Sequence, residues 1–156
     1  MTSVVDVVRL TRPGLEELAE LAAWDEEAFG HTALRSFDLG VVARAGGLFV
    51  ARVDGQTAAC CQLVRTFDEP GVFWVVGFWV RPAWQGRGLG RALLAAVARE
   101  VRAAEGFGLM LTVEPDNVRA INLYSSFGFR FVEEAPEFYG PGEDRHVLRW
   151  EDDHGS

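Results

Sequence analysis

The fold is decided by one stretch, Val80-Arg81-Pro82-Ala83-Trp84-Gln85-Gly86-Arg87-Gly88-Leu89-Gly90-Arg91-Ala92-Leu93-Leu94. It runs from an apolar strand through a glycine-rich turn into a helix. The helix is predicted to be amphipathic, because leucine and valine recur four residues apart from Leu89 to Val101. Glycine at every second position of the turn removes the side chains that would keep a ligand from the backbone. Consecutive N–H groups can then converge on an anion at the helix start. The stretch therefore predicts a phosphate cradle.

The spacing of the glycines excludes two common kinds of phosphate-binding loop. A P-loop needs a lysine directly after its last glycine, and all 15 basic residues of this chain are arginine. A dinucleotide-binding loop needs a glycine three positions after Gly88, where Arg91 stands. What remains is the pattern Gln85-x-x-Gly88-x-Gly90, preceded by a strand that ends in Phe78-Trp79-Val80.

A second motif follows at a suitable distance. It reads Asn117-Val118-Arg119-Ala120-Ile121-Asn122-Leu123-Tyr124-Ser125-Ser126-Phe127-Gly128-Phe129, with an asparagine that opens a short helix and a tyrosine two turns later. The two motifs together resemble the GNAT superfamily of N-acetyltransferases. The first is similar to the loop that binds the pyrophosphate of acyl-CoA in that superfamily. The resemblance covers most of the chain from about Leu48 onward.

The resemblance implies one GNAT domain over residues 1–156, with residues 151–156 as a mobile tail. Its class is α/β (α+β), with a mixed central sheet of about seven strands flanked by about four helices. The sheet is expected to be largely antiparallel, with a splayed parallel pair in the middle. Hydrophobic patterning and turn residues place strands at residues 4–10, 48–53, 57–66, 72–80, 109–113, 129–132 and 145–150.

Helices are predicted in four segments of the sequence, the second of which has an irregular turn as its alternative. Apolar residues recur at helical spacing over residues 15–22, and residues 24–34 form a second helix or an irregular turn. The helix that follows Gly88 is expected to end at Gly106, which would serve as its C-terminal glycine. The last helix begins after Asn117, and Gly128 caps it.

Composition excludes several function classes. The net charge of −8 argues against nucleic acid as a partner, although Arg81, Arg87 and Arg91 form a locally positive stretch without acidic residues. No apolar run approaches the roughly 20 residues of a membrane span, and Met1-Thr2-Ser3 lacks the basic start of a signal peptide. The chain is therefore expected to be cytoplasmic and to bind no membrane.

The only cysteines are Cys60 and Cys61, which are neighbours in a predicted strand. Their side chains point to opposite faces, so a mutual disulfide or a shared metal site is not expected. The sequence therefore predicts that both cysteines are buried and in the reduced thiol form, and that the protein binds no metal. The alternative is a reaction in which a cysteine carries the acyl group covalently.

The resemblance implies acetyl-CoA as the acyl donor. Backbone groups of Phe78 and Val80 would pair with the pantetheine amides, while N–H groups from Gly86 to Arg91 hold the pyrophosphate. The side chains of Gln85, Arg87 and Arg91 could assist, and purely solubilising roles for the two arginines remain open. The implied cofactor-binding residues are Phe78, Val80, Gln85, Gly86, Arg87, Gly88, Leu89, Gly90, Arg91 and Asn117.

By its position in the second motif, Tyr124 is the implied general acid. A phenol with a pKa near 10 stays protonated at neutral pH and can donate to a departing thiolate of similar basicity. Seven residues separate Tyr124 from Asn117, which predicts that both lie on one helical face directed toward the cofactor. The alternative is a packed tyrosine whose hydroxyl is satisfied within the fold.

The general base is where the chain departs from the superfamily. Many relatives carry a glutamate at the position of Trp74, and the ribosomal-protein N-terminal acetyltransferases carry one at the position of Thr112. Glu114 is the nearest replacement along the chain. Weaker candidates are Glu26, Glu27, His31, Glu137 and His146. A water relay, or an acceptor amine of low basicity, would also serve.

The missing base favours weakly basic acceptors. An α-amino group is about a tenth neutral at pH 7, whereas a lysine side chain is neutral in less than about one part in a thousand. The acceptor is expected to be a small-molecule amine or a peptide N-terminus, and the stretch Phe138-Tyr139-Gly140-Pro141-Gly142 resembles the late hairpin of the peptide acetyltransferases. Trp74 would favour an apolar or aromatic acceptor if it faced the cofactor gap.

Two hypotheses in which the protein is not an enzyme remain as alternatives. In the first, the protein is an acyl-CoA-binding sensor, which keeps the cradle but releases no CoA when an acceptor is added. In the second, it is a partner-binding domain that does not bind the cofactor. The superfamily also admits a homodimer, because its edge strands often pair between two copies.

Overall fold

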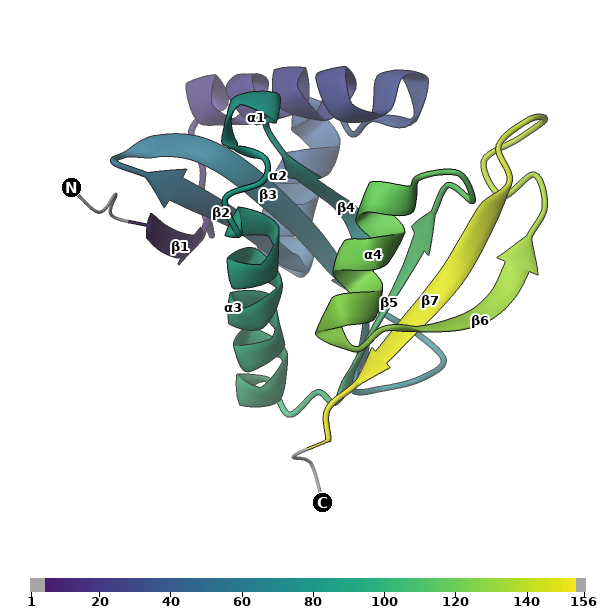
Figure 1. Ribbon diagram of the computed structural model, residues 1–156. Coiled ribbons are helices and arrows are strands. Elements are labelled where there is room, and N and C mark those ends of the chain that lie inside the picture. The colour runs from purple at the N-terminus through teal and green to yellow at the C-terminus, as the bar shows by residue number, and fades with distance from the viewer. Residues whose placement is uncertain (1–4, 154–156) are drawn as a thin grey trace. The chain divides into compact units, whose positions relative to one another are not determined.

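The computed structural model describes residues 5–153, which divide into two compact units. The first unit comprises residues 5–64 and 76–97, and the second comprises residues 65–75 and 98–153. The strands are β1 (Val5–Arg9), β2 (Gly47–Val53), β3 (Gln56–Arg65), β4 (Val72–Val80), β5 (Gly108–Val113), β6 (Arg130–Ala135) and β7 (Arg145–Glu151) (Figure 1). The helices are α1 (Leu15–Phe29), α2 (Ser36–Ala45), α3 (Leu89–Ala103) and α4 (Val118–Phe127), with 3₁₀ turns η1 (Gly30–Thr32) and η2 (Pro82–Trp84).

The strands form one mixed sheet of seven, in the order β1-β2-β3-β4-β5-β7-β6. Within residues 5–153 the parallel pair is β4 with β5, whose ladder runs from Val72 opposite Gly108 to Val75 opposite Leu111. The predicted fold class is thereby confirmed. No helix in this part of the chain is long and apolar enough to cross a membrane. The cytoplasmic location stays a prediction.

The first unit is built around the apolar faces of α1 and α2. Leu18 and Leu21 of α1 are buried together with Leu39 and Val42 of α2, at the spacing of one helical face. The buried members of this core are Leu10, Leu18, Leu21, Leu39, Val42, Ala43, Leu48, Val50, Cys60 and Trp79. Cys60 and Cys61 are both fully buried, and burial raises the pKa of both thiols.

The helices of the first unit differ from the prediction. Residues 24–29 continue α1, so a separate second helix at residues 24–34 is wrong, and the alternative of an irregular turn holds only from Gly30 onward, where η1 lies. The real second helix, α2, was not predicted. Its buried positions are only three, Leu39, Val42 and Ala43, because Ser36, Asp38 and Gly40 interrupt the apolar pattern.

In the second unit, α4 packs on β7 through aromatic rings (Figure 1). The ring centroid of Phe127 lies 5.8 Å from that of Trp150, and the Tyr124 centroid lies 5.5 Å from that of Phe129. The helix begins as predicted at Asn117, whose Oδ1 accepts the N–H of Ala120 at 3.2 Å. It also ends as predicted at Gly128, which has φ +121°.

The end of α3 differs from the prediction. The helix stops at Ala103, and Glu105 takes the left-handed conformation (φ +63°) that was expected of Gly106. Gly106 is needed for space, because an added Cβ would meet Cε1 of Phe73 and Cγ1 of Val101, each at 2.7 Å. Its N–H donates to the carbonyl of Val101 at 2.7 Å and closes the helix end.

The C-terminal residues make defined contacts. Glu151 is the last residue of β7, and the carboxylate of Asp152 accepts Nε of Arg102 at 2.9 Å. The N–H of Asp152 also donates to the carbonyl of Phe107 at 2.7 Å. The mobile tail at residues 151–156 stays a prediction, and its residues 154–156 lie outside the described part of the chain.

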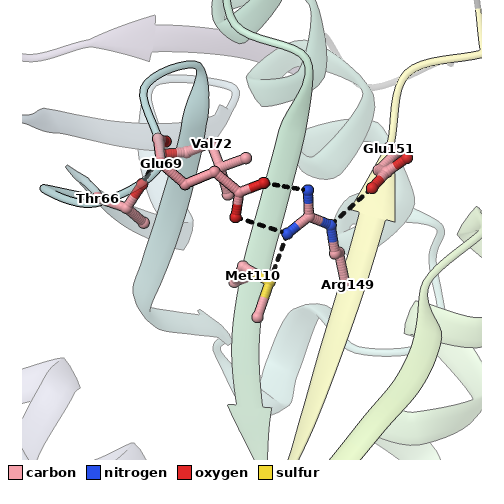
Figure 2. A network of polar contacts seen from close by, with 6 residues as sticks. All are labelled: Thr66, Glu69, Val72, Met110, Arg149 and Glu151. Carbon is pink, nitrogen blue, oxygen red and sulfur yellow. Dashed lines mark hydrogen bonds and ion pairs between the residues drawn. The ribbon is translucent and has the colours of Figure 1, made fainter.

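Arg149 of β7 ties the turn between β3 and β4 to the sheet of the second unit (Figure 2). Its Nη1 and Nη2 donate to the two carboxylate oxygens of Glu69 at 2.9 and 2.7 Å, and its Nε donates to Glu151 at 2.8 Å. The hydroxyl of Thr66 closes the same turn by donating to the carbonyls of Glu69 and Val72. Hydrogen bonding from Arg149 holds the pKa of Glu69 below its ordinary value.

This pairing makes part of the stability depend on pH. Because the pKa of Glu69 is lowered by folding, its contribution is present above the ordinary value of 4.5 and is lost as pH falls below it. We expect Glu69→Gln to lower Tm at pH 7, and the difference from the wild type to shrink as pH drops below about 4.5. Thermal unfolding followed by circular dichroism from pH 3 to 7 measures this. A Tm difference that stays constant across the series would contradict it.

Candidate acetyl-CoA site

The glycine-rich loop follows β4 through the turn η2 and leads into α3, and residues 76–97 of this stretch belong to the first unit. Gly86 and Gly88 have φ +77° and +79°, a conformation that side chains rarely adopt. An added Cβ at Gly88 would meet nothing within 4 Å, so the backbone there is bare and open on one side. The loop has the backbone conformation that the phosphate-cradle interpretation requires.

The loop is anchored at both ends. Before it, the N–H of Arg81 donates to the carbonyl of Ala58 at 2.8 Å, which ties the end of β4 to β3. After it, Leu89 is buried against Val53 and Ala58. Within it, Nε2 of Gln85 donates to the carbonyl of Val80 at 2.9 Å. These contacts tie the loop to the neighbouring strands.

The first turn of α3 directs N–H groups out of the helix. The N–H of Ala92 bonds to the carbonyl of Gly88 at 3.1 Å, which makes Gly88 the residue at the helix start. The N–H groups of Leu89 and Gly90 then have no acceptor within the helix, and the helix dipole adds positive potential there. An anion is the expected ligand of such a helix start.

The three arginines of this region have different environments. The guanidinium of Arg81 lies 3.6 Å from the ring centroid of Trp24 and donates to the carbonyl of Thr57 at 2.9 Å, so it is held within the fold. Arg87 is exposed and lies 5.2 Å from the ring of Trp84, and Arg91 is exposed as well. Arg87 and Arg91 are therefore the cations that an anion at the loop could reach.

Phe78 and Val80 lie in the outer half of β4, which belongs to the first unit. They share one half-buried face of the strand with Trp74 and Val76, because alternate residues point the same way. The carbonyl of Val80 accepts from Gln85, and its second lone pair can accept another donor.

Asn117 and Tyr124 belong to α4, in the second unit. Asn117 is exposed at the helix start, and its side-chain oxygen caps the helix. Tyr124 is only 6% exposed and packs against Phe129. The predicted site residues thus divide between the units, with the loop residues, Phe78 and Val80 in the first and these two in the second.

Both positions at which relatives carry a base contact the loop between β6 and β7. The ring of Trp74 is parallel to that of Phe138 within 4°, with centroids 6.2 Å apart. The hydroxyl oxygens of Thr112 and Tyr139 lie 3.5 Å apart. These contacts form within the second unit and leave no carboxylate at either position.

The other base candidates are scattered. Oε1 of Glu114 lies 3.8 Å from Nη2 of the buried Arg145, so this carboxylate forms part of an ion pair. The ring of His146 meets that of Phe131 edge-on at 5.1 Å. Within residues 5–153, no group of three or more His, Cys, Asp or Glu side chains gathers as a metal site requires.

Glu26 and His31 come together at a groove that the sequence did not predict. The groove has a volume of about 430 Å³ and lies beside α1 and the segment that follows it, in the first unit. Ala19, Ala22, Ala23 and Glu26 of α1 line it together with residues of the segment after the helix. Its lining residues are Ala19, Ala22, Ala23, Glu26, Gly30, His31, Ala33, Leu34, Arg35 and Ser36.

Comparison with known proteins identifies the family. Residues 14–129 match the family described as Acetyltransferase (GNAT) family. The chain belongs to the GNAT family. It is accordingly an acyltransferase, and the expected resemblance is confirmed.

Two of its relatives have nearly the same length as this chain. The chain is 33% identical over 157 residues to the N-alpha-acetyltransferase RimI of Mycobacterium tuberculosis, covering 95% of this chain and 93% of that protein. It is 29% identical to an aminoglycoside N(6')-acetyltransferase type 1 of Stenotrophomonas maltophilia, over 80% and 90% of the two chains. Among solved structures, yncA from Salmonella typhimurium with its cofactor acetyl-CoA has a TM-score of 0.75 at 20% identity, covering 97% and 96%.

Proposed function

We propose that this GNAT protein transfers the acetyl group of acetyl-CoA to a primary amine, on a small molecule or at a peptide N-terminus. The observation that carries the proposal is the loop from Gln85 to Arg91, with its two left-handed glycines and its bare backbone at the start of α3. These groups fit a diphosphate, and Arg87 and Arg91 supply nearby positive charge. We propose that both units work as one acetyltransferase domain.

When bound, acetyl-CoA supplies an activated acetyl group as a thioester. In the proposal, backbone groups of Phe78 and Val80 align the pantetheine arm as an added strand would. The carboxamide nitrogen of Asn117 is available to donate to the cofactor, since its oxygen caps α4.

Tyr124 is the proposed general acid. The amine nitrogen forms a bond to the acetyl carbon as the bond from that carbon to sulfur breaks, and the Tyr124 hydroxyl gives its proton to the sulfur. The amine loses its own proton to water, because Trp74 and Thr112 stand where relatives carry a carboxylate. An amine that is already partly neutral at pH 7 reacts best under these conditions, which favours α-amino groups over lysine side chains.

The proposal assigns the acceptor to the groove beside α1. Its Glu26 can attract a cationic amine. The names of the relatives support acceptors of both classes, since one is an N-alpha-acetyltransferase and another acts as an aminoglycoside acetyltransferase.

Two measurements test this function in order. Calorimetric titration with acetyl-CoA should show binding at one site. Thiol release should then depend on an added acceptor, with alanine-initiated peptides or aminoglycosides preferred over Nα-blocked lysine. Binding without acceptor-dependent release from any amine would instead indicate a sensor, and the absence of binding would overturn the proposal.

A further inference from the structure

Asp25 is a buried acid for which the proposed chemistry has no use. It lies on α1 with 1% of its surface exposed. Its Oδ2 accepts the N–H of Leu34 at 2.7 Å, while its Oδ1 accepts Nε2 of Gln62 at 2.5 Å and Nε1 of Trp79 at 2.9 Å. A buried carboxylate is tolerated only when donors replace its lost water, and here three donors converge on it.

The two carboxylate oxygens of Asp25 hold different parts of the first unit. Oδ2 holds the segment after η1, in which Leu34 lines the groove. Oδ1 holds the sheet, through Gln62 of β3 and Trp79 of β4. One side chain therefore connects the wall of the groove to the strand that carries Phe78 and Val80.

The sheet side of this connection is closely fitted. An added Cβ at Gly77 would collide with Oε1 of Gln62 and would lie 3.3 Å from the ring of Phe29. Glycine in the middle of β4 thus makes room for the amide that donates to Asp25. Trp79 is 5% exposed, and the next residue, Val80, accepts from Gln85 of the cradle. Hydrogen bonds, together with the peptide bond between Trp79 and Val80, therefore connect the groove to the loop.

We propose that Asp25 is a positioning residue for acetyl transfer, which holds the groove wall at Leu34 in register with β4. The proposal rests on the proposed function for its assignment of the groove to the acceptor. Asp25 touches neither partner of the reaction. Its loss should impair use of the acceptor and should spare the binding of acetyl-CoA.

The substitution Asp25→Asn distinguishes the hydrogen bond from Leu34 from the hydrogen bond from Trp79, and it changes the volume of the side chain little. An asparagine has one acceptor oxygen, so it cannot accept from Leu34 and from Trp79 at the two positions that the carboxylate serves. In either orientation of the amide, one of these two N–H groups loses its partner. We expect that group to exchange with solvent at least about tenfold faster by NMR hydrogen exchange, as the loss of a hydrogen bond to a charged group implies.

The kinetic readout is the KM of the best acceptor in the panel above. We expect Asp25→Asn to raise this KM about tenfold, with the Kd for acetyl-CoA within about twofold of wild type. Glu16→Gln removes the same charge from the exposed side of α1 and should change neither the exchange rates nor the KM. Trp79→Phe, which removes the indole N–H that donates from β4 together with part of the ring, should raise the KM by a smaller factor and keep the Leu34 amide protected.

The outcomes separate the hypotheses. The inference would be overturned if Asp25→Asn lowered the Tm and left the KM unchanged. It would also be overturned if the KM and the Kd for acetyl-CoA rose by the same factor. Either result would make Asp25 a purely structural residue. Should Asp25→Asn fail to fold, the same readouts on Trp79→Phe decide. A wild-type protein that binds no acetyl-CoA would refute the proposed function, and the exchange measurement would still report the connection.

Discussion

Replacing Tyr124 by phenylalanine should lower kcat about 100-fold or more and leave the Kd for acetyl-CoA unchanged. A positioned general acid contributes about 10²–10⁴ to a rate, and the hydroxyl is the only group that this substitution removes. The ring is buried against Phe129 at 5.5 Å, a contact that phenylalanine retains. Steady-state thiol release with saturating acceptor, together with calorimetry, measures both quantities.

Tyr139→Phe is the matched control, because the chain contains only two tyrosines. Tyr139 is 42% exposed, and its hydroxyl has a long 3.5 Å contact with Thr112. We expect this variant to keep kcat close to that of the wild type. If Tyr124→Phe instead keeps its kcat, Tyr124 has no part in the chemistry.

The second large effect is expected at the cradle. Gly88→Val should raise the Kd for acetyl-CoA by about 10- to 100-fold, because a β-branched residue at φ +79° is strained by about 1–3 kcal/mol. The loop would relax to another conformation, and its N–H groups would no longer converge. An added Cβ meets nothing within 4 Å, so the rest of the fold is spared a collision. Calorimetric titration of the purified variant measures the change in Kd.

Gly55→Val provides the control for Gly88→Val. Gly55 has φ +82° in the turn between β2 and β3, and an added Cβ there also meets nothing within 4 Å. The strain is therefore matched, while the position lies outside the cradle. A similar drop in Tm for both variants, with a raised Kd only for Gly88→Val, is the expected pattern. Equal Kd values for the two variants would remove the loop from cofactor binding.

Strong local signals made much of the fold predictable. β4 was placed at Val72–Val80 because a long apolar run between turn residues is typical of a central strand. The left-handed turn at Asp54 and Gly55, and the caps at Asn117 and Gly128, also follow from local chemistry. Each of these features depends on residues close together in the chain.

The features that were not predicted from the sequence depend on tertiary contacts. Glu105 takes the left-handed position because Gly106 is required where the ring of Phe73 leaves no room for a side chain. Asp152 is fixed by Arg102, a residue 50 positions earlier in the chain. Patterns within a short window contain no information on either partner.

The candidate site also contains one feature that local sequence predicts and one that depends on tertiary contacts. The spacing of its glycines predicted the cradle, whose backbone has the required conformation. Asp25, in contrast, belongs to an acidic run with Glu26 and Glu27 that is typical of a solvated surface. Its place four and seven residues after Leu21 and Leu18 puts it on the apolar face of α1 instead, and this spacing was the available signal.

The ion pair between Glu69 and Arg149 spans 80 positions of the chain, and both residues belong to the second unit. β5 of that unit also pairs with β7, the last strand that the structure describes. The unit cannot complete its sheet until β7 has been synthesised. Contacts of such long sequence separation form slowly, so Glu69 waits for Arg149 while the residues between them emerge from the ribosome.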